Sequence, residues 1–402
     1  MGEMRAHVSR WVLPVSQPPL KDGAVLVAGD RIRAVGPAAE ILKGFKGPVI
    51  DHGQGFILPG LVNCHTHLEF SALAGRVAPK ESWEDWLNAT LAAFPRLSPE
   101  ELEAGIVQGL QALWDCGTVL VGEVSNTGSS WPHLENSPLA YHLFYECLGF
   151  DLQALGKLEE AFPFFTLPAL AKAPWVSAAA HAPYSVSPAL FRAIGQWNGA
   201  RRRLQTVHLG ESQAEVDFLC QGGGFFQELL KKRGRWVEGC QPPQLSPAAY
   251  LDSLDFLGPR TLTVHGVWLN GDDCGRLART HTWLVLCPRA NLYTGAGTPP
   301  LPELLRAGVP LALGTDSLAG NRDLNLFGEM LWLYEKFPDC PGDRWLRLGT
   351  LNGAKALGRQ EDYGSLEPGK VAAMGFIPLE GTGDFWEELW AAGAAGEWCW
   401  LR

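Results

Sequence analysis

Eight short apolar runs between residues 58 and 357 constrain the fold of this chain more than any other feature. Segments typical of helices, such as SPEELEAGIVQGLQALWDCG, separate the runs. Strands that alternate with helices pair in parallel, and eight such units predict an α/β fold, a (β/α)8 TIM barrel over residues 58–357. The predicted strands are residues 61–67, 118–124, 139–148, 176–182, 204–210, 260–266, 282–287 and 309–316.

The two ends of the chain follow another pattern. Residues 1–57 contain short strand-like stretches around a turn at Gly29-Asp30, and their alternation of polar and apolar residues suits a half-buried antiparallel sheet. The tail returns to strand-like sequence in GSLEPGKVAAMGFIP and again in GEWCWLR. We therefore predict that residues 1–57 and 358–402 together form a small β-sandwich domain.

Composition excludes several classes of protein. Lys and Arg number 33 against 43 Asp and Glu, a net charge of −10 that argues against nucleic acid as a partner. The chain has no apolar run of about 18 residues and no signal peptide at its start, which predicts a cytoplasmic protein without a membrane partner. The nine cysteines form no CxxC pair, so no disulfide framework is expected.

Two histidines lie two residues apart in the sequence HTH. On a strand, His65 and His67 point to the same face and can share a metal ion. An isolated pair of this kind is weak evidence. The position of the pair strengthens it, because barrel chemistry gathers at the carboxyl ends of strands.

The same position recurs in four later strands. His181 ends the fourth strand, His208 the fifth, His265 the sixth and Asp316 the eighth. The alternative reading needs several structural histidines that each lie at a strand end by chance. A set of three neutral imidazoles and one carboxylate suits zinc, with Fe(II) as the alternative, and leaves a coordination position for water.

An acid follows the fifth predicted strand. Glu211 lies three residues after His208, where its carboxylate can face a bound substrate, so we predict that it is a proton shuttle. The alternative role is an N-terminal cap of the helix that begins near Gln213.

Six segments, taken in order, resemble the signature segments of the amidohydrolase superfamily. They are LPGLVNCHTHLE, VHLGES, TVHGVWL, CPRANLY, LALGTDS and NGAKALG. Within the superfamily the chain resembles the branch of deaminases and chlorohydrolases that hold a single metal. This resemblance implies that the metal ligands are His65, His67, His208 and Asp316, that His265 contacts the metal-bound water, and that Glu211 protonates a ring nitrogen.

The fourth strand bears on the number of metal ions. Members with two metals carry a carboxylated lysine there, whereas this chain reads AAAHAPYS. The resemblance therefore implies one divalent ion, with His181 facing the substrate. The alternative for His181 is a structural histidine under the loop.

A narrower resemblance concerns the substrate. HLEFS, VGEVSN, HAPYSVSP and CPRANLY are similar to the aminodeoxyfutalosine deaminases of menaquinone biosynthesis. The related S-adenosylhomocysteine and methylthioadenosine deaminases carry a ribose-binding Glu where this chain has Ala78-Pro79-Lys80. Glu69 is the predicted substitute, and its alternative is an acid that holds nearby backbone.

Three further residues are candidates for substrate contacts. Trp86 could line a purine pocket, although tryptophans at such spacing also pack helices onto barrels. Asn126 and Arg289 lie at strand ends, where they could meet the substrate.

The sequence thus predicts hydrolytic deamination of a 6-aminopurine nucleoside by a metal-activated hydroxide, with aminodeoxyfutalosine favoured. The alternatives are a methylthioadenosine/S-adenosylhomocysteine, guanine or cytosine deaminase, a cyclic-amide or chloro-ring hydrolase, and a non-catalytic scaffold. Deaminases that flip bases out of polynucleotides need a PCxxC motif, which is absent. The expected partner is a small nucleoside, and a homodimer is one possible assembly.

Overall fold

Eight parallel strands, together with the helices that pack around them, form the larger part of the molecule. The computed structural model describes residues 4–379, 381 and 383–401. Each of the eight predicted runs contains one strand, which confirms the strand prediction. The strands are β6 Leu61–Thr66, β7 Thr118–Ser125, β8 Ala140–Cys147, β9 Val176–Ala180, β10 Gln205–Leu209, β11 Thr261–His265, β12 Trp283–Leu286 and β13 Leu311–Leu313.

These strands form two four-stranded parallel sheets, in the orders β6-β7-β8-β9 and β10-β11-β12-β13. Helices connect successive strands, as expected for parallel pairing. They are α2 Trp83–Ala93, α3 Pro99–Asp115, α4 Trp131–Glu135, α5 Leu158–Ala161, α6 Pro188–Ala200, α7 Gln213–Gln221, α8 Gly224–Lys232, α9 Pro247–Ser253, α10 Gly271–Arg279, α11 Pro288–Thr294 and α12 Leu301–Ala307. Three more helices follow the last of these strands, β13: α13 Leu326–Lys336, α14 Gly342–Arg347 and α15 Gly353–Ala356.

Helix α3 packs closely on the segment that follows the HTH sequence. Ser98 caps its start through a capping box, as its sequence favours. Gly105 faces the 3-10 helix Leu68–Leu73 so closely that a Cβ atom there would lie 2.4 Å from the backbone nitrogen of Ala72. A glycine is therefore needed for α3 to support this segment.

Side-chain amides help to join the two sheets. Where β9 faces β10, Asn198 of α6 takes the place of a neighbouring strand: its Oδ1 accepts from the Ala178 N–H at 3.1 Å, and its Nδ2 donates to the Ala178 carbonyl at 2.8 Å. Where β13 faces β6, Asn63 Nδ2 donates to Thr315 Oγ1 at 2.7 Å. We call these two contact lines the β9/β10 seam and the β13/β6 seam.

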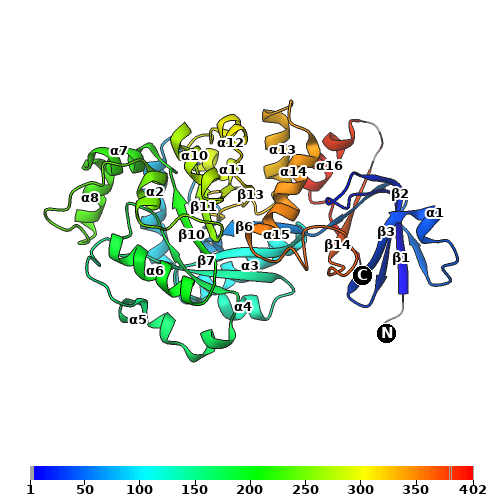
Figure 1. The fold of residues 1–402 in the computed structure, drawn as a ribbon, viewed down its shortest axis with the longest axis horizontal. Coiled ribbons are helices and arrows are strands. Elements are labelled where there is room, and N and C mark those ends of the chain that lie inside the picture. The colour runs from blue at the N-terminus through cyan, green and yellow to red at the C-terminus, as the bar shows by residue number, and fades with distance from the viewer. Residues whose placement is uncertain (1–3, 380, 382, 402) are drawn as a thin grey trace.

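Strands from both chain ends form one seven-stranded sheet, at the right in Figure 1. Its order is β15-β14-β5-β1-β2-β3, with β4 paired to β1. The predicted turn at Gly29-Asp30 joins β2 to β3. The strands are β1 Met4–Val12, β2 Leu20–Ala28, β3 Arg31–Pro37, β4 Val49–Asp51, β5 Gly55–Pro59, β14 Met374–Pro378 and β15 Cys399–Trp400, and a short helix, α1 Ala38–Ile41, follows β3.

Strand-like sequence at both ends is thus confirmed. The described strands lie in a single sheet, and a sandwich arrangement is not confirmed. Residues 1–3, 380, 382 and 402 of the predicted domain lie outside the described residues.

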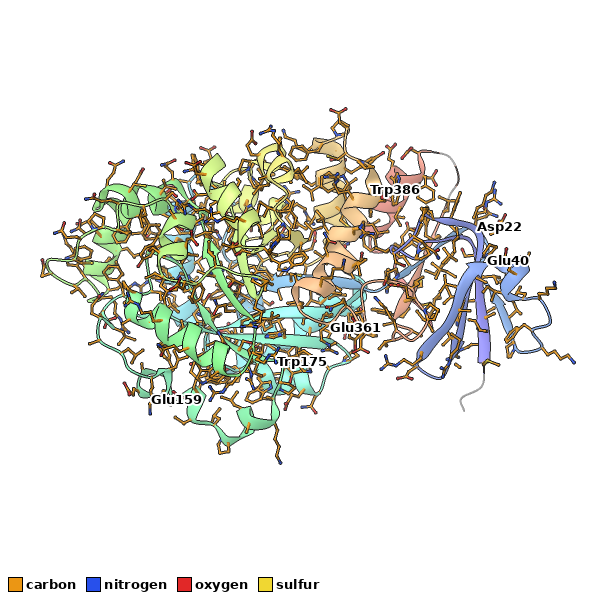
Figure 2. All side chains as sticks on the ribbon, viewed as in Figure 1. Asp22, Glu40, Glu159, Trp175, Glu361 and Trp386 are labelled. Carbon is orange, nitrogen blue, oxygen red and sulfur yellow. The ribbon has the colours of Figure 1, made fainter. Side chains whose placement is uncertain are left out.

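Helix α16, Phe385–Ala394, was not predicted from the sequence. Its Phe385 ring packs edge-on against Trp11 of β1, with ring centroids 5.0 Å apart. Trp390 is fully buried beneath Trp386, which Figure 2 labels between the helices and the terminal sheet. Aromatic packing therefore attaches the terminal sheet to the rest of the molecule.

No helix among the described residues is both long and apolar enough to cross a membrane.

Replacing Asn198 with alanine should destabilise the protein, because two buried backbone groups of Ala178 would lose their partners. We expect the free energy of unfolding to fall by about 2–4 kcal/mol, measured by urea denaturation. The control is Asn136→Ala, since the Asn136 amide donates to the Pro132 carbonyl on the exposed surface. A similar loss in both variants would contradict this role of Asn198.

Candidate metal centre and active site

Three histidine side chains meet at the carboxyl ends of β6 and β10. His65 belongs to β6, His67 follows that strand, and His208 belongs to β10. All three are buried, and a set of their ring nitrogens lies within 4.8 Å of one another. The structure therefore brings together three of the four predicted ligands from two different sheets.

The distances between these rings fit one metal ion. The Nε2 atoms of His67 and His208 are 3.3 Å apart, close to the ~3.3 Å edge of a tetrahedron with metal–nitrogen bonds of about 2.0–2.1 Å. His65 Nε2 is buried and has no hydrogen-bond partner in the described part of the chain. An unpartnered buried nitrogen at this place suits a ligand atom.

The protonation of the histidines also suits metal binding. Burial, reinforced by the neighbouring imidazoles, lowers the pKa of His65 and His67 well below the ordinary value. Both rings are therefore neutral, as a metal ligand must be. His208 Nδ1 donates to the carbonyl of His181 at 2.7 Å, which leaves the lone pair on Nε2.

Asp316 completes the predicted set. Its Oδ1 lies 3.8 Å from Nε2 of both His65 and His67. Its backbone has a φ of 56°, a left-handed conformation that few non-glycine residues adopt. Burial raises the pKa of Asp316 to about 6. A carboxylate buried against neutral imidazoles is costly to ionise, and a divalent cation would offset this cost.

His265, at the end of β11, faces Glu211. His265 Nδ1 donates to Asn291 Oδ1 at 2.8 Å, since a carbonyl oxygen only accepts. The lone pair therefore lies on Nε2, which is 3.7 Å from Glu211 Oε1. Asn291 was not predicted as a functional residue, although it lies in the signature segment CPRANLY.

The loop after β10 presents Glu211 to the site. Glu215 holds this loop, because its carboxylate accepts from the backbone N–H groups of Gly210 at 2.9 Å and Glu211 at 3.2 Å. Ser212, not Glu211, caps α7. The side chain of Glu211 is thus free of the alternative capping role, and burial raises its pKa. A carboxyl group with a raised pKa suits proton transfer near neutral pH.

His181 follows β9 beside His208. Its Nδ1 is 2.6 Å from Ser185 Oγ, and its carbonyl accepts from both the backbone N–H and Nδ1 of His208. The backbone of His181 is therefore structural, and the residue as a whole is only partly buried. A substrate contact by the ring stays a prediction.

Glu69 is buried in the 3-10 helix after His67. Its carboxylate accepts from Ser125 Oγ, from the backbone N–H of Asn126 at 3.1 Å and from Thr127 Oγ1 at 2.8 Å. These bonds all hold the loop after β7. They support the alternative of an acid that holds nearby backbone, and they weigh against a ribose contact by Glu69.

Trp86 and Arg289 lie in different surroundings. Trp86 Nε1 donates to the Ala319 carbonyl at 2.8 Å, in the loop after Asp316. Arg289 forms a two-pronged ion pair with Asp323, at 2.6 and 2.9 Å, beside a cavity of about 450 Å³ that none of the four predicted ligands lines. The structure does not bring Arg289 to the histidine cluster, and its substrate contact stays a prediction.

Sequence reasoning missed two buried acids near the cluster. Glu123 of β7 accepts from the backbone N–H of Leu68 with both carboxylate oxygens, which fixes the chain after His67. Glu146 of β8 has its Oε1 3.5 Å from His208 Nδ1. Each of these acids interrupts a largely apolar predicted strand, and this pattern could have indicated that Glu123 and Glu146 have a role at the site.

The family model described as the Amidohydrolase family matches residues 56–382, most of the chain. The protein therefore belongs to the amidohydrolase family. This confirms the resemblance noted in the sequence and the predicted class, a hydrolytic enzyme of the aminohydrolase type. The metal dependence of this family agrees with the three-histidine cluster.

Two curated relatives are similar over most of their length. A 5-methylthioadenosine/S-adenosylhomocysteine deaminase of Syntrophobacter fumaroxidans is 28% identical over 390 residues, which are 88% of this chain and 79% of the relative. An aminodeoxyfutalosine deaminase of Deinococcus radiodurans is 27% identical over 376 residues, 88% of this chain and 85% of the relative.

Two solved structures share the fold. The aminofutalosine deaminase of Helicobacter pylori in complex with methylthio-coformycin is 22% identical with a TM-score of 0.81, covering 98% of this chain and 100% of that chain. An adenosine deaminase of Xanthomonas campestris with bound zinc is 24% identical, also with a TM-score of 0.81, covering 98% and 90%.

Removing one imidazole of the cluster should abolish stable metal binding. We expect the zinc-supplemented protein to hold about one zinc per chain by elemental analysis. The His67→Ala variant should hold far less, because one of the ligand nitrogens is lost. His133→Ala, which removes a partly exposed histidine outside the cluster, should keep the metal. Equal zinc content in the three proteins would refute the assignment.

Proposed function

We propose that the protein deaminates a 6-aminopurine nucleoside by hydrolysis, with aminodeoxyfutalosine as the favoured substrate. The observation that carries this proposal is the Glu211–His265 pair, 3.7 Å apart, buried beside the three-histidine cluster. Hydrolysis of an aromatic amine needs a proton at the ring nitrogen as well as an oriented water, and Glu211 can supply the proton while His265 orients the water. Relatives that act on adenine nucleosides support the choice of substrate class.

Four residues would hold the metal ion of the proposed reaction. A divalent ion held by His65, His67, His208 and Asp316 would supply Lewis acidity and lower the pKa of water. Zinc is favoured and Fe(II) is the alternative.

Glu211 is the group that brings a proton to the purine, and burial, which raises its pKa, favours the protonated carboxyl group. It gives this proton to N1 of the purine while water adds to C6. His265 Nε2 accepts a hydrogen bond from that water and orients it. The added water gives up two protons: one passes through Asp316 or Glu211 to the amino group, which leaves as ammonia, and the other returns to Glu211 as the 6-oxo group forms, which restores the starting enzyme.

We also propose the finer organisation of the fold. The two parallel sheets would form one closed (β/α)8 barrel over residues 58–357, with residues 1–57 and 358–402 as the second domain. A cytoplasmic location, a nucleoside as partner and a homodimer stay predictions.

Ammonia release by zinc-loaded protein from a panel of substrates tests the reaction. We expect release from adenine nucleosides, measured by a coupled ammonia assay, and loss of the adenine absorbance as the 6-oxo product forms. Guanine, cytosine, a cyclic amide and a chlorinated triazine should react far more slowly. Turnover of a cyclic amide or a chloro-ring alone would refute the deaminase proposal, and no turnover at all would favour a scaffold.

The Glu211→Gln variant tests the proton shuttle. A glutamine keeps the shape but cannot carry the proton, so kcat should fall by roughly 100- to 10,000-fold with the zinc content unchanged. Glu303→Gln changes an acid whose side chain is 44% exposed on α12, and it should keep full activity. Full activity in Glu211→Gln would remove this residue from the mechanism.

A further inference from the structure

Two buried oxygen atoms beside the metal centre have no hydrogen-bond partner. They are Glu146 Oε1 and Asn126 Oδ1. The two side chains form one unit, because Asn126 Nδ2 donates to Glu146 Oε2 at 2.6 Å. One pair of side chains thus presents two unused acceptors.

The surroundings hold this pair in place. Glu146 lies in β8 and is 4% exposed, while Asn126 follows the neighbouring strand β7. Glu69 accepts from the backbone N–H of Asn126 at 3.1 Å and from Thr127 Oγ1 at 2.8 Å. The acceptors are therefore preorganised, which lowers the entropy cost of binding a ligand.

The pair lies at the edge of the proposed active site. Glu146 Oε1 is 3.5 Å from His208 Nδ1. A carboxylate oxygen of Glu146 and ring nitrogens of His181 and His208 lie within 4.8 Å of one another. Of these three residues, His181 is the one that is not fully buried, so the pair adjoins the less buried side of the centre.

The nearby donors are already engaged. The His208 Nδ1 proton goes to the His181 carbonyl at 2.7 Å, and the Asn126 amide donates to Glu146 Oε2. A second metal ion on Glu146, His181 and His208 is disfavoured for the same reason, since His208 Nδ1 carries a proton and Nε2 faces His67. A buried acceptor without a donor destabilises the protein, so a ligand that brings donors would relieve this cost.

We propose that Asn126 and Glu146 bind the 2′- and 3′-hydroxyl groups of the ribose. This assignment rests on the proposed function. Two adjacent acceptors match two adjacent hydroxyl donors, and neither has another donor among the described residues. The pair would replace the acid that the chain lacks at Ala78-Pro79-Lys80. Glu69 then acts as a positioning residue that fixes Asn126.

The test combines substrates that lack the hydroxyls with variants that lack the acceptors. Adenosine and 2′,3′-dideoxyadenosine are assayed with zinc-loaded wild type, Glu146→Ala and Asn126→Ala. Wild type should favour adenosine by about 10- to 100-fold in kcat/KM, since the hydrogen bonds of both hydroxyl groups to Asn126 and Glu146 are lost in the dideoxy compound. In either variant this preference should shrink to below about 3-fold, because its origin is gone.

Glu135→Ala, which removes a surface acid near β8, should keep the wild-type preference and serves as the matched control. Glu146→Gln should restore part of the preference, because the amide keeps an acceptor oxygen. Zinc analysis of each variant shows whether His208 still binds metal. If Glu146→Ala does not fold, Asn126→Ala carries the test.

Calorimetric binding of purine riboside and its 2′,3′-dideoxy analogue gives a readout that does not depend on turnover. Equal affinities in wild type, or a preference that survives in both variants, would overturn the ribose subsite. Nucleosides that bind with this preference but are not deaminated would instead overturn the proposed function. The two failures are thus distinguishable.

Discussion

Backbone hydrogen bonds across the two seams hold the metal centre together. The His208 N–H donates to the His181 carbonyl at 2.9 Å across the β9/β10 seam, and the N–H of Asp316 donates to the His65 carbonyl at 3.1 Å across the β13/β6 seam. The proposed ligands thus come from different sheets, yet each seam carries a main-chain bond made by a ligand, from Asp316 to His65 and from His208 to His181. Because main-chain positions vary less than side-chain rotamers, this arrangement holds the imidazoles and carboxylate at ligand distances.

Burial makes the orientation of each side chain consequential. In a site from which water is excluded, a proton on the wrong ring nitrogen would remove a ligand or a base. The His181 carbonyl and the Asn291 amide oxygen prevent this by accepting from Nδ1 of His208 and His265. His181 lies in the loop after β9 and Asn291 in helix α11, so the chemistry depends on neighbours that are distant in the sequence.

The sequence predicts features that have a local pattern, but it does not predict contacts between residues that are distant in the sequence. Strand positions follow from apolar runs, and His65, His67, His208 and Asp316 follow from their place at strand ends, because parallel strands bring their carboxyl ends to one edge. The contacts that orient side chains have no local pattern. Glu69 was predicted to meet ribose, yet its bonds go to the loop after β7. Helix α16 was missed because its aromatic residues pack on distant parts of the chain, Phe385 on Trp11 of β1 and Trp390 on Phe327 of α13.

The terminal sheet has a consequence for the order of folding. Strand β5 pairs on one side with β1 and on the other with β14, whose residues come more than 300 positions later along the chain. During synthesis, the first strands to leave the ribosome must therefore wait with an open edge until nearly the whole chain has been made. An open edge of apolar strands invites pairing with other chains. The strands that are synthesised first thus gain their last partner strand only when synthesis is nearly complete, and until then their free edge can pair with other chains.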